Sequence, residues 1–82
     1  MAEVKFSKGS EEWLMFMDYW NLCQKCWEVE NSDKYWQDLI GAIDYFVDKY
    51  KSIPLAEQLG LALANTQSTK QKMLKEKENE DE

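Results

Sequence analysis

Cys23 and Cys26 form the pair of side chains whose types and spacing are most suggestive of chemistry in this 82-residue sequence. A C-x-x-C pair can bind zinc, but zinc takes four ligands, and the sequence has two cysteines and no histidine. A redox pair lies at the start of a helix, whereas these cysteines fall in the middle of a helical pattern. We therefore interpret both as small core-filling side chains. A zinc site shared between two chains, or a redox role, remains the alternative, and metal analysis tests it.

The acidic residues give no stronger case for catalysis. Pairs such as Glu11 with Glu12, or Asp44 with Asp48, have spacings that are common among solvated charges on a helix surface. The sequence contains no histidine for general base catalysis, no glycine-rich phosphate loop and no G-x-S-x-G motif. It therefore predicts a protein that is not an enzyme, with no catalytic residue, no cofactor and no metal.

The charge of the chain argues against direct binding to nucleic acid. The net charge is −6, and all ten basic residues are lysines, whereas arginine is the usual residue for phosphate and base-edge contacts. No apolar run approaches the roughly 18 residues that a membrane span needs. The first residues show no apolar stretch of a secretion signal, and two cysteines fit a reducing compartment. We expect a cytoplasmic protein that does not contact membranes.

Three helical patterns account for most of the chain, which fits one small domain. Ser10 and Ser32 are predicted N-caps, and Pro54 is placed for the first turn of a third helix. The predicted organisation is a flexible arm over 1–9, a bundle over 10–74 with helices at about 10–30, 33–51 and 53–68 or longer, and a disordered charged tail over 75–82. Short connections make successive helices antiparallel neighbours, which predicts an all-α, up-down-up three-helix bundle. A helical hairpin that completes its core by dimerising is the alternative.

The first helix carries two apolar seams that together cover roughly 240° of its circumference, far more than the ~100° of an ordinary surface helix. An aromatic stripe at helical spacing is usually core, so the tryptophan seam is expected to be buried and Trp20→Ala to unfold the protein. This seam contains Trp13, Phe16, Met17, Trp20, Cys23 and Trp27. The other seam is the candidate docking surface for a protein partner, with the candidate residues Met15, Tyr19, Leu22 and Cys26. The alternative is that the third helix covers this seam.

A second candidate surface lies on the polar side of the second helix. Asp38, Tyr45 and Asp48 fall on one outward row with Lys34 and Gly41. Tyrosine is enriched at protein interfaces, so Tyr45 is a candidate anchor flanked by the two carboxylates. A single exposed aromatic side chain is also common without any function.

The chain resembles a group of short acidic helical proteins encoded on prophages and other mobile elements of Gram-positive bacteria. The resemblance covers about residues 11–64 and rests on mostly structural positions: Glu12-Trp13, Phe16, Tyr19-Trp20, Tyr35-Trp36-x-x-Leu39-Ile40, Asp44, Tyr50-Lys51 and Ala62-Leu63-Ala64. It implies no catalytic or binding residue. It implies a setting in which small acidic proteins often act by binding something larger.

The sequence as a whole predicts a non-enzymatic module that works through protein–protein contact, with another protein or with a second copy of itself. The alternative is an acidic inhibitor of a nucleic-acid-handling machine, similar to an anti-CRISPR protein. That alternative requires Asp38, Asp44, Asp48 and the acids of the first helix to form a continuous exposed row. A net charge of −6 permits such a row but is also explained by solubility alone.

Overall fold

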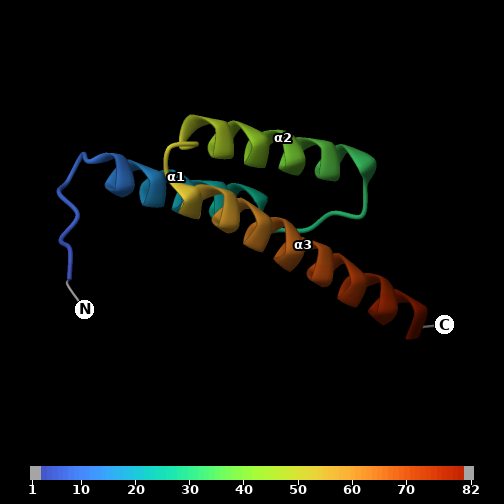
Figure 1. Ribbon diagram of the computed structural model, residues 1–82. Helices are drawn as coiled ribbons and strands as arrows, with labels where there is room; N and C mark the ends of the chain where they lie inside the picture. The colour runs from blue at the N-terminus through green and yellow to red at the C-terminus, as the bar shows by residue number, and fades with distance from the viewer. Residues whose placement is uncertain (1–2, 81–82) are drawn as a thin grey trace.

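Three α-helices form the protein in the computed structural model, which describes the backbone of residues 3–80 and the side chains of residues 3–76. They are α1 (Glu11–Cys26), α2 (Asp33–Lys49) and α3 (Pro54–Glu80). Figure 1 shows α2 running back along α1, and α3 running forward again and extending past the other two helices. The predicted all-α, up-down-up three-helix bundle is confirmed. None of the described helices is long and apolar enough to cross a membrane.

The helix starts follow local sequence signals. The hydroxyl of Ser10 accepts a hydrogen bond from the Trp13 amide at 3.3 Å, and that of Ser32 accepts one from the Tyr35 amide at 3.1 Å. Pro54 is the first residue of α3, a position where its missing N–H costs nothing. The predicted caps are therefore confirmed.

The end of α1 differs from the prediction, because the helix stops at Cys26 and not near residue 30. The carbonyl oxygens of Cys26 and Trp27 accept hydrogen bonds from the amide of Gln67, at 2.6 and 3.1 Å. The Tyr35 hydroxyl also donates to the Cys26 carbonyl, at 2.6 Å. Side chains of α2 and α3 thus bind the carbonyls that a further helical turn would have used.

The third helix is longer than predicted. The expected disordered tail over 75–82 is wrong for residues 75–80, which continue α3, while residues 81 and 82 lie outside the described residues. Residues 75–80 are lysines and glutamates apart from Asn79, and both residue types are among the stronger helix formers, so intrinsic propensity favours the helix where no core supports it. Of the predicted arm, the described residues 3–9 are not helical.

The core lies where the three helices face one another. It consists of Met15, Leu22, Cys26, Leu39, Ile43, Phe46, Tyr50, Ala56 and Leu63, with Gln67 buried among them. Helices α2 and α3 approach closely at Gly60 of α3, where an added Cβ would lie 3.0 Å from side-chain methyl carbons of Ile43 and Val47 on α2. Among the described residues, the core therefore combines aliphatic and sulfur-containing side chains with the rings of Phe46 and Tyr50, and it contains no tryptophan.

Candidate functional site: an exposed tryptophan face

One side of α1 is apolar and open to solvent. Its side chains are 37% exposed at Trp13, 39% at Phe16, 45% at Met17, 63% at Trp20 and 52% at Trp27. We call these five residues the tryptophan face. They recur at helical spacing along the whole of α1 and its C-cap residue, so they form one continuous stripe. Scattered exposed hydrophobic residues are ordinary in proteins, whereas a contiguous stripe of five large ones makes this side of α1 a candidate contact surface.

The structure reverses the predicted roles of the two seams. Met15, Leu22 and Cys26, predicted as an exposed docking surface, are 1%, 9% and 9% exposed and belong to the core. Tyr19 is half-buried, with its ring centroid 5.6 Å from that of Phe46. Burial raises the pKa of Tyr19 to about 12, so its hydroxyl stays protonated. The predicted exposure of this seam is wrong, and its buried members are not accessible to a partner.

The reason is geometric. The axes of packed helices generally lie about 8–10 Å apart, and the distance depends on the side chains between them. Gly60 of α3 lies close against Ile43 and Val47 of α2, and Ala56 is fully buried, so the helices meet closely around a core that includes Met15, Leu22 and Cys26 of α1. Indole rings at the same positions would force the helices apart. The seam of smaller side chains therefore takes the core, and the tryptophan seam faces outward.

Grooves flank Trp27, at the C-terminal end of the tryptophan face. One groove, of 410 Å³, is lined by Trp27, Glu28, Val29, Lys70, Met73 and Leu74. The other, of 550 Å³, is lined by Trp20, Cys23, Gln24, Trp27 and Glu28. The Lys70 ammonium donates a hydrogen bond to the Trp27 carbonyl at 2.6 Å and lies 3.7 Å from the centroid of its ring. This cation–π contact holds the indole in place beside both grooves.

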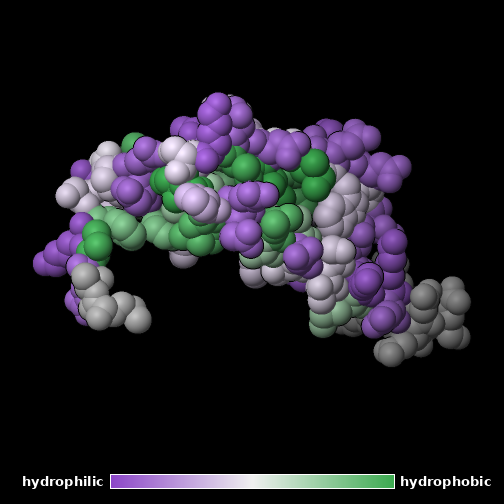
Figure 2. Space-filling model, viewed as in Figure 1, coloured by the Kyte–Doolittle hydropathy of each residue, from purple (hydrophilic) through white to green (hydrophobic). Residues whose placement is uncertain are grey.

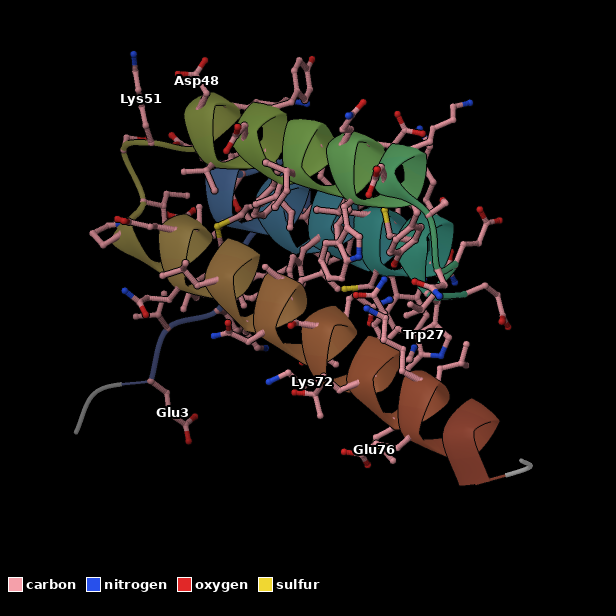
Figure 3. All side chains as sticks on the ribbon, turned by 90° about the vertical axis from the view of Figure 1, so that its right-hand side faces the viewer. Glu3, Trp27, Asp48, Lys51, Lys72 and Glu76 are labelled. Atoms are coloured by element: carbon pink, nitrogen blue, oxygen red, sulfur yellow. The ribbon has the colours of Figure 1, made fainter. Side chains whose placement is uncertain are left out.

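Figure 3 shows Trp27 beside α3, near the place where α3 leaves the bundle. Lys72 and Glu76 are on the outer side of this part of α3 in the same view. Met73 and Leu74 are 63% and 42% exposed, although both are apolar. The last described turns of α3 thus form an overhang that extends the apolar surface beyond the end of α1.

The opposite end of the tryptophan face is extended by the N-terminal arm. The Phe6 ring packs on Phe16 with centroids 5.7 Å apart, yet Phe6 and Val4 remain 49% and 75% exposed. Glu11 and Glu12 lie in the first turn of α1 at this end, and the Ser52 hydroxyl hydrogen-bonds to Glu11. The apolar stripe therefore has an acidic first turn at one end and Lys70 at the other.

The outer side of α2 is hydrophilic. Asp38, Asp44 and Asp48 are exposed there, and Tyr45 is 72% exposed, as predicted. In Figure 2 this side, at the top of the view, is largely purple, whereas green and pale atoms lie across the middle below it. The three aspartates spread over about 120° of the helix, with Lys34 and Tyr45 between them, so they do not form the single row that the predicted mimic requires.

A groove of 390 Å³ runs between α1 and α2. Leu22, Ala42 and Phe46 contribute its apolar lining, and its other lining residues are Asp18, Asn21, Lys25, Tyr45 and Lys49. Tyr45, a predicted partner residue, therefore borders a concave surface, whereas Asp38 and Asp48 do not line this groove. Asp38 instead lines a separate hollow near the end of α1, with Cys26 and Tyr35.

The two cysteines are free thiols and differ in their surroundings. Cys26 is buried in the core and Cys23 is half-buried beside it. Burial raises the pKa of Cys26, which lowers the thiolate fraction that metal binding and disulfide exchange need. Among the described residues, no three histidine, cysteine or acidic side chains come together in a way that could hold a metal ion. The arrangement fits the core-filling interpretation of Cys26.

The charged contact nearest the core is structural. Asp18 of α1 accepts hydrogen bonds from the Tyr50 hydroxyl and from the Lys49 ammonium, the latter at 2.9 Å. These two donors hold the pKa of Asp18 below its usual value, and the Tyr50 hydroxyl has the larger effect. Burial and the hydrogen bond to Asp18 raise the pKa of Tyr50. A carboxylate that stays ionised and a phenol that stays protonated at neutral pH link α1 to the end of α2.

The fold and this surface define a class of protein: a small three-helix bundle with a complete core and one helix face of large apolar side chains left uncovered. Comparisons with known protein families, with curated proteins and with solved structures find no match. The functional argument therefore rests on the surface itself.

Proposed function

We propose that this chain is a non-enzymatic, cytoplasmic protein-interaction module that docks another protein chain on the tryptophan face. The observation that carries the proposal is the uncovered stripe from Trp13 to Trp27. Aromatic side chains and methionine are enriched at the centres of protein interfaces, where tryptophan contributes more binding energy than most residues. The setting of prophages and mobile elements, implied by the sequence resemblance, is part of the same proposal.

A protein partner fits this face better than a membrane surface does. Helices that lie in a bilayer interface combine an apolar face with a polar face rich in lysine and arginine. The polar residues of α1 instead include Glu11, Glu12 and Asp18, against Lys25 as the one basic residue. Anionic lipid headgroups would be repelled by such a helix, and the net charge of −6 adds to the repulsion.

The test is site-specific photocrosslinking in cells that produce the protein. A photoreactive amino acid replaces Gln24, which is exposed beside Trp20 and Trp27. The matched control replaces Gln37, an exposed glutamine on the outer side of α2. We expect a discrete protein adduct from position 24 and none from position 37, and loss of the adduct on Trp20→Glu. Equal adducts from both positions, or no protein adduct from position 24, would contradict the proposal.

The acidic inhibitor remains the second candidate, because Asp38, Asp44 and Asp48 are all exposed on α2. It is the weaker candidate, since lysines interrupt the acids of this side and Asp18 is paired with Lys49. The two candidates differ in salt dependence. Binding of a basic nucleic-acid-binding protein through carboxylates falls steeply as salt rises, whereas docking on the tryptophan face persists. Binding that is lost with Asp44→Asn and Asp48→Asn, and kept with Trp20→Glu, would favour the inhibitor.

A further inference from the structure

We infer that the occupant of the tryptophan face is a second copy of this chain, packed with its α1 antiparallel to the first across a twofold axis near Trp20. This inference rests on the proposed function and names its partner. Four features of the described residues support it: the spacing of the face, the apolar residues beyond its two ends, the charges near those ends, and the area it offers.

The spacing is that of a helix-packing seam. Trp13, Trp20 and Trp27 recur every seven residues, with Phe16 and Cys23 three residues after the first two. This is the a/d pattern by which one helix packs lengthwise along another. The complementary surface is thus a helix with the same repeat, and α1 itself has that repeat. In an antiparallel pair centred on Trp20, Trp13 of each copy faces Trp27 of the other.

The two ends of the molecule complement each other in that arrangement. Val4 and Phe6 extend the apolar surface at the N-terminal end of α1, and Met73 and Leu74 extend it at the other end. Figure 1 shows the N-terminal arm and the overhang of α3 at opposite ends of the bundle. A twofold axis near the middle of α1 brings the arm of each copy to the overhang of the other, so both exposed apolar pairs become covered.

Charge favours the antiparallel over the parallel arrangement. The first turn of α1 carries Glu11 and Glu12, whereas at the other end of the face Lys70 lies over the Trp27 ring, with Glu28 beside it. Antiparallel packing brings the acidic first turn of each copy toward Lys70 of the other. Parallel packing would set the two acidic turns side by side, and like charges across an interface are unfavourable.

The area is sufficient for a dimer. Large side chains can bury about 150–250 Å² each, so the exposed parts of the tryptophan face amount to roughly 500 Å² per copy. A pair would bury about 1,000 Å² from these side chains alone. The arm and the overhang bring the total toward the about 1,200–2,000 Å² of specific, stable interfaces.

The first experiment measures the mass of the purified chain by light scattering and sedimentation over a range of concentrations, at low and high salt. We expect a dimer that persists at high salt. Trp20→Glu places two carboxylates against each other at the axis and is expected to raise the dimer dissociation constant at least ~100-fold. The matched control, Tyr45→Glu, adds the same charge in place of an exposed aromatic residue on α2 and should leave the dimer intact. Circular dichroism of both variants checks the fold.

The second experiment determines the orientation of the pair. Filtered NMR spectra of a mixed sample, with one copy isotopically labelled, are expected to show contacts between Trp13 and Trp27 of different copies. Intermolecular contacts between the two Trp27 rings without Trp13–Trp27 contacts would indicate a parallel pair and overturn the arrangement. A dimer unaffected by Trp20→Glu would overturn the assigned surface.

The outcomes separate this inference from the proposed function. A chain that stays monomeric at all concentrations, but gives a crosslinked adduct with a different protein from position 24, retains the interaction module and overturns the second copy as its partner. A monomer that gives no protein adduct from that position overturns both.

Discussion

Gln67 provides the most direct test of how the bundle holds together. Its side chain is fully buried, and its amide nitrogen donates to the carbonyls of Cys26 and Trp27 and lies 2.9 Å from the Tyr35 hydroxyl. One side chain of α3 therefore binds the end of α1 and a residue of α2. Replacing it with methionine keeps the length and the burial of the side chain but removes all three polar contacts.

Gln67→Met is expected to lower the free energy of unfolding by about 2 kcal/mol. A buried hydrogen bond contributes about 0.5–1.5 kcal/mol net, and three are lost. Two effects limit the loss: the Tyr35 hydroxyl and Lys70 still donate to the two carbonyls, and the amide oxygen of Gln67, which is buried without a partner, is removed as well. Gln67→Glu is expected to cost more at neutral pH, about 3–5 kcal/mol, because a buried carboxylate would face carbonyl oxygens.

Urea unfolding followed by circular dichroism measures both variants, with Asn65→Met, an exposed position on the same helix, as the control. For the glutamate variant, burial raises the folded-state pKa above that of the unfolded chain. The loss of unfolding free energy in Gln67→Glu relative to wild type is therefore present at neutral pH. It becomes smaller as pH falls toward the pKa of about 4.3 in the unfolded chain. The reasoning is refuted if Gln67→Met unfolds within about 0.5 kcal/mol of the wild type, or if the deficit of Gln67→Glu is the same at pH 7 and pH 4.5.

Further predictions concern the two sides of α1, two glycines and one carboxylate. At a concentration where the chain is monomeric, Trp20→Ala is expected to lower the free energy of unfolding by less than about 1 kcal/mol, and Leu39→Ala, at a fully buried position, by about 2–5 kcal/mol. Thermal or urea unfolding measures both, and equal decreases would contradict the core described above. Gly41→Ala, where an added Cβ meets nothing within 4 Å, is expected to stabilise the protein by about 0.5–1 kcal/mol. Gly60→Ala is expected to destabilise it by about 1–2 kcal/mol, because the two methyl carbons 3.0 Å away belong to stiff β-branched side chains; a stabilised variant would disprove this close approach. The pKa of Asp18 lies below its usual 3.8, so the hydrogen bonds to its carboxylate stabilise the fold above that pH and are lost as pH falls below it. Between pH 5 and pH 2.5 the free energy of unfolding is expected to fall by about 1 kcal/mol more in wild type than in Asp18→Asn, a figure reduced because the carboxylate is 39% exposed. Parallel curves of unfolding free energy against pH for the two proteins would exclude this contact.

The helix starts were predictable because the groups that determine them are local. Ser10 and Ser32 bind amides three residues ahead, and Pro54 acts through its own ring. The end of α1 was not predictable in the same way. The Cys26 carbonyl is bound by Tyr35 of α2 and by Gln67, which is 41 positions away and comes close only once α3 is in place.

The reversal of the two seams has a different cause. Both seams on α1 have helical periodicity, so periodicity alone could not decide which one faces the core. The deciding factor is how closely α2 and α3 pack, as at Gly60 against Ile43 and Val47, because such a centre does not accommodate indole rings. Gly60 inside the third helical pattern was the signal in the sequence for a close approach of this helix to a neighbour. The exposure of Asp38, Tyr45 and Asp48 was predictable because polar neighbours surround them on α2.

The placement of the tryptophans also separates folding from function in this chain. The core contains none of the five side chains of the tryptophan face, so the bundle can form without them. The exposed side chains of the tryptophan face do not stabilise a monomer, because apolar surface contributes favourable free energy only when it is removed from water. Core substitutions such as Leu39→Ala are therefore expected to reduce stability and, through it, binding. Face substitutions such as Trp20→Glu are expected to abolish association while the helices remain folded. A variant of the tryptophan face that lost the fold would show that the face belongs to the core, and the case for a binding surface would end there.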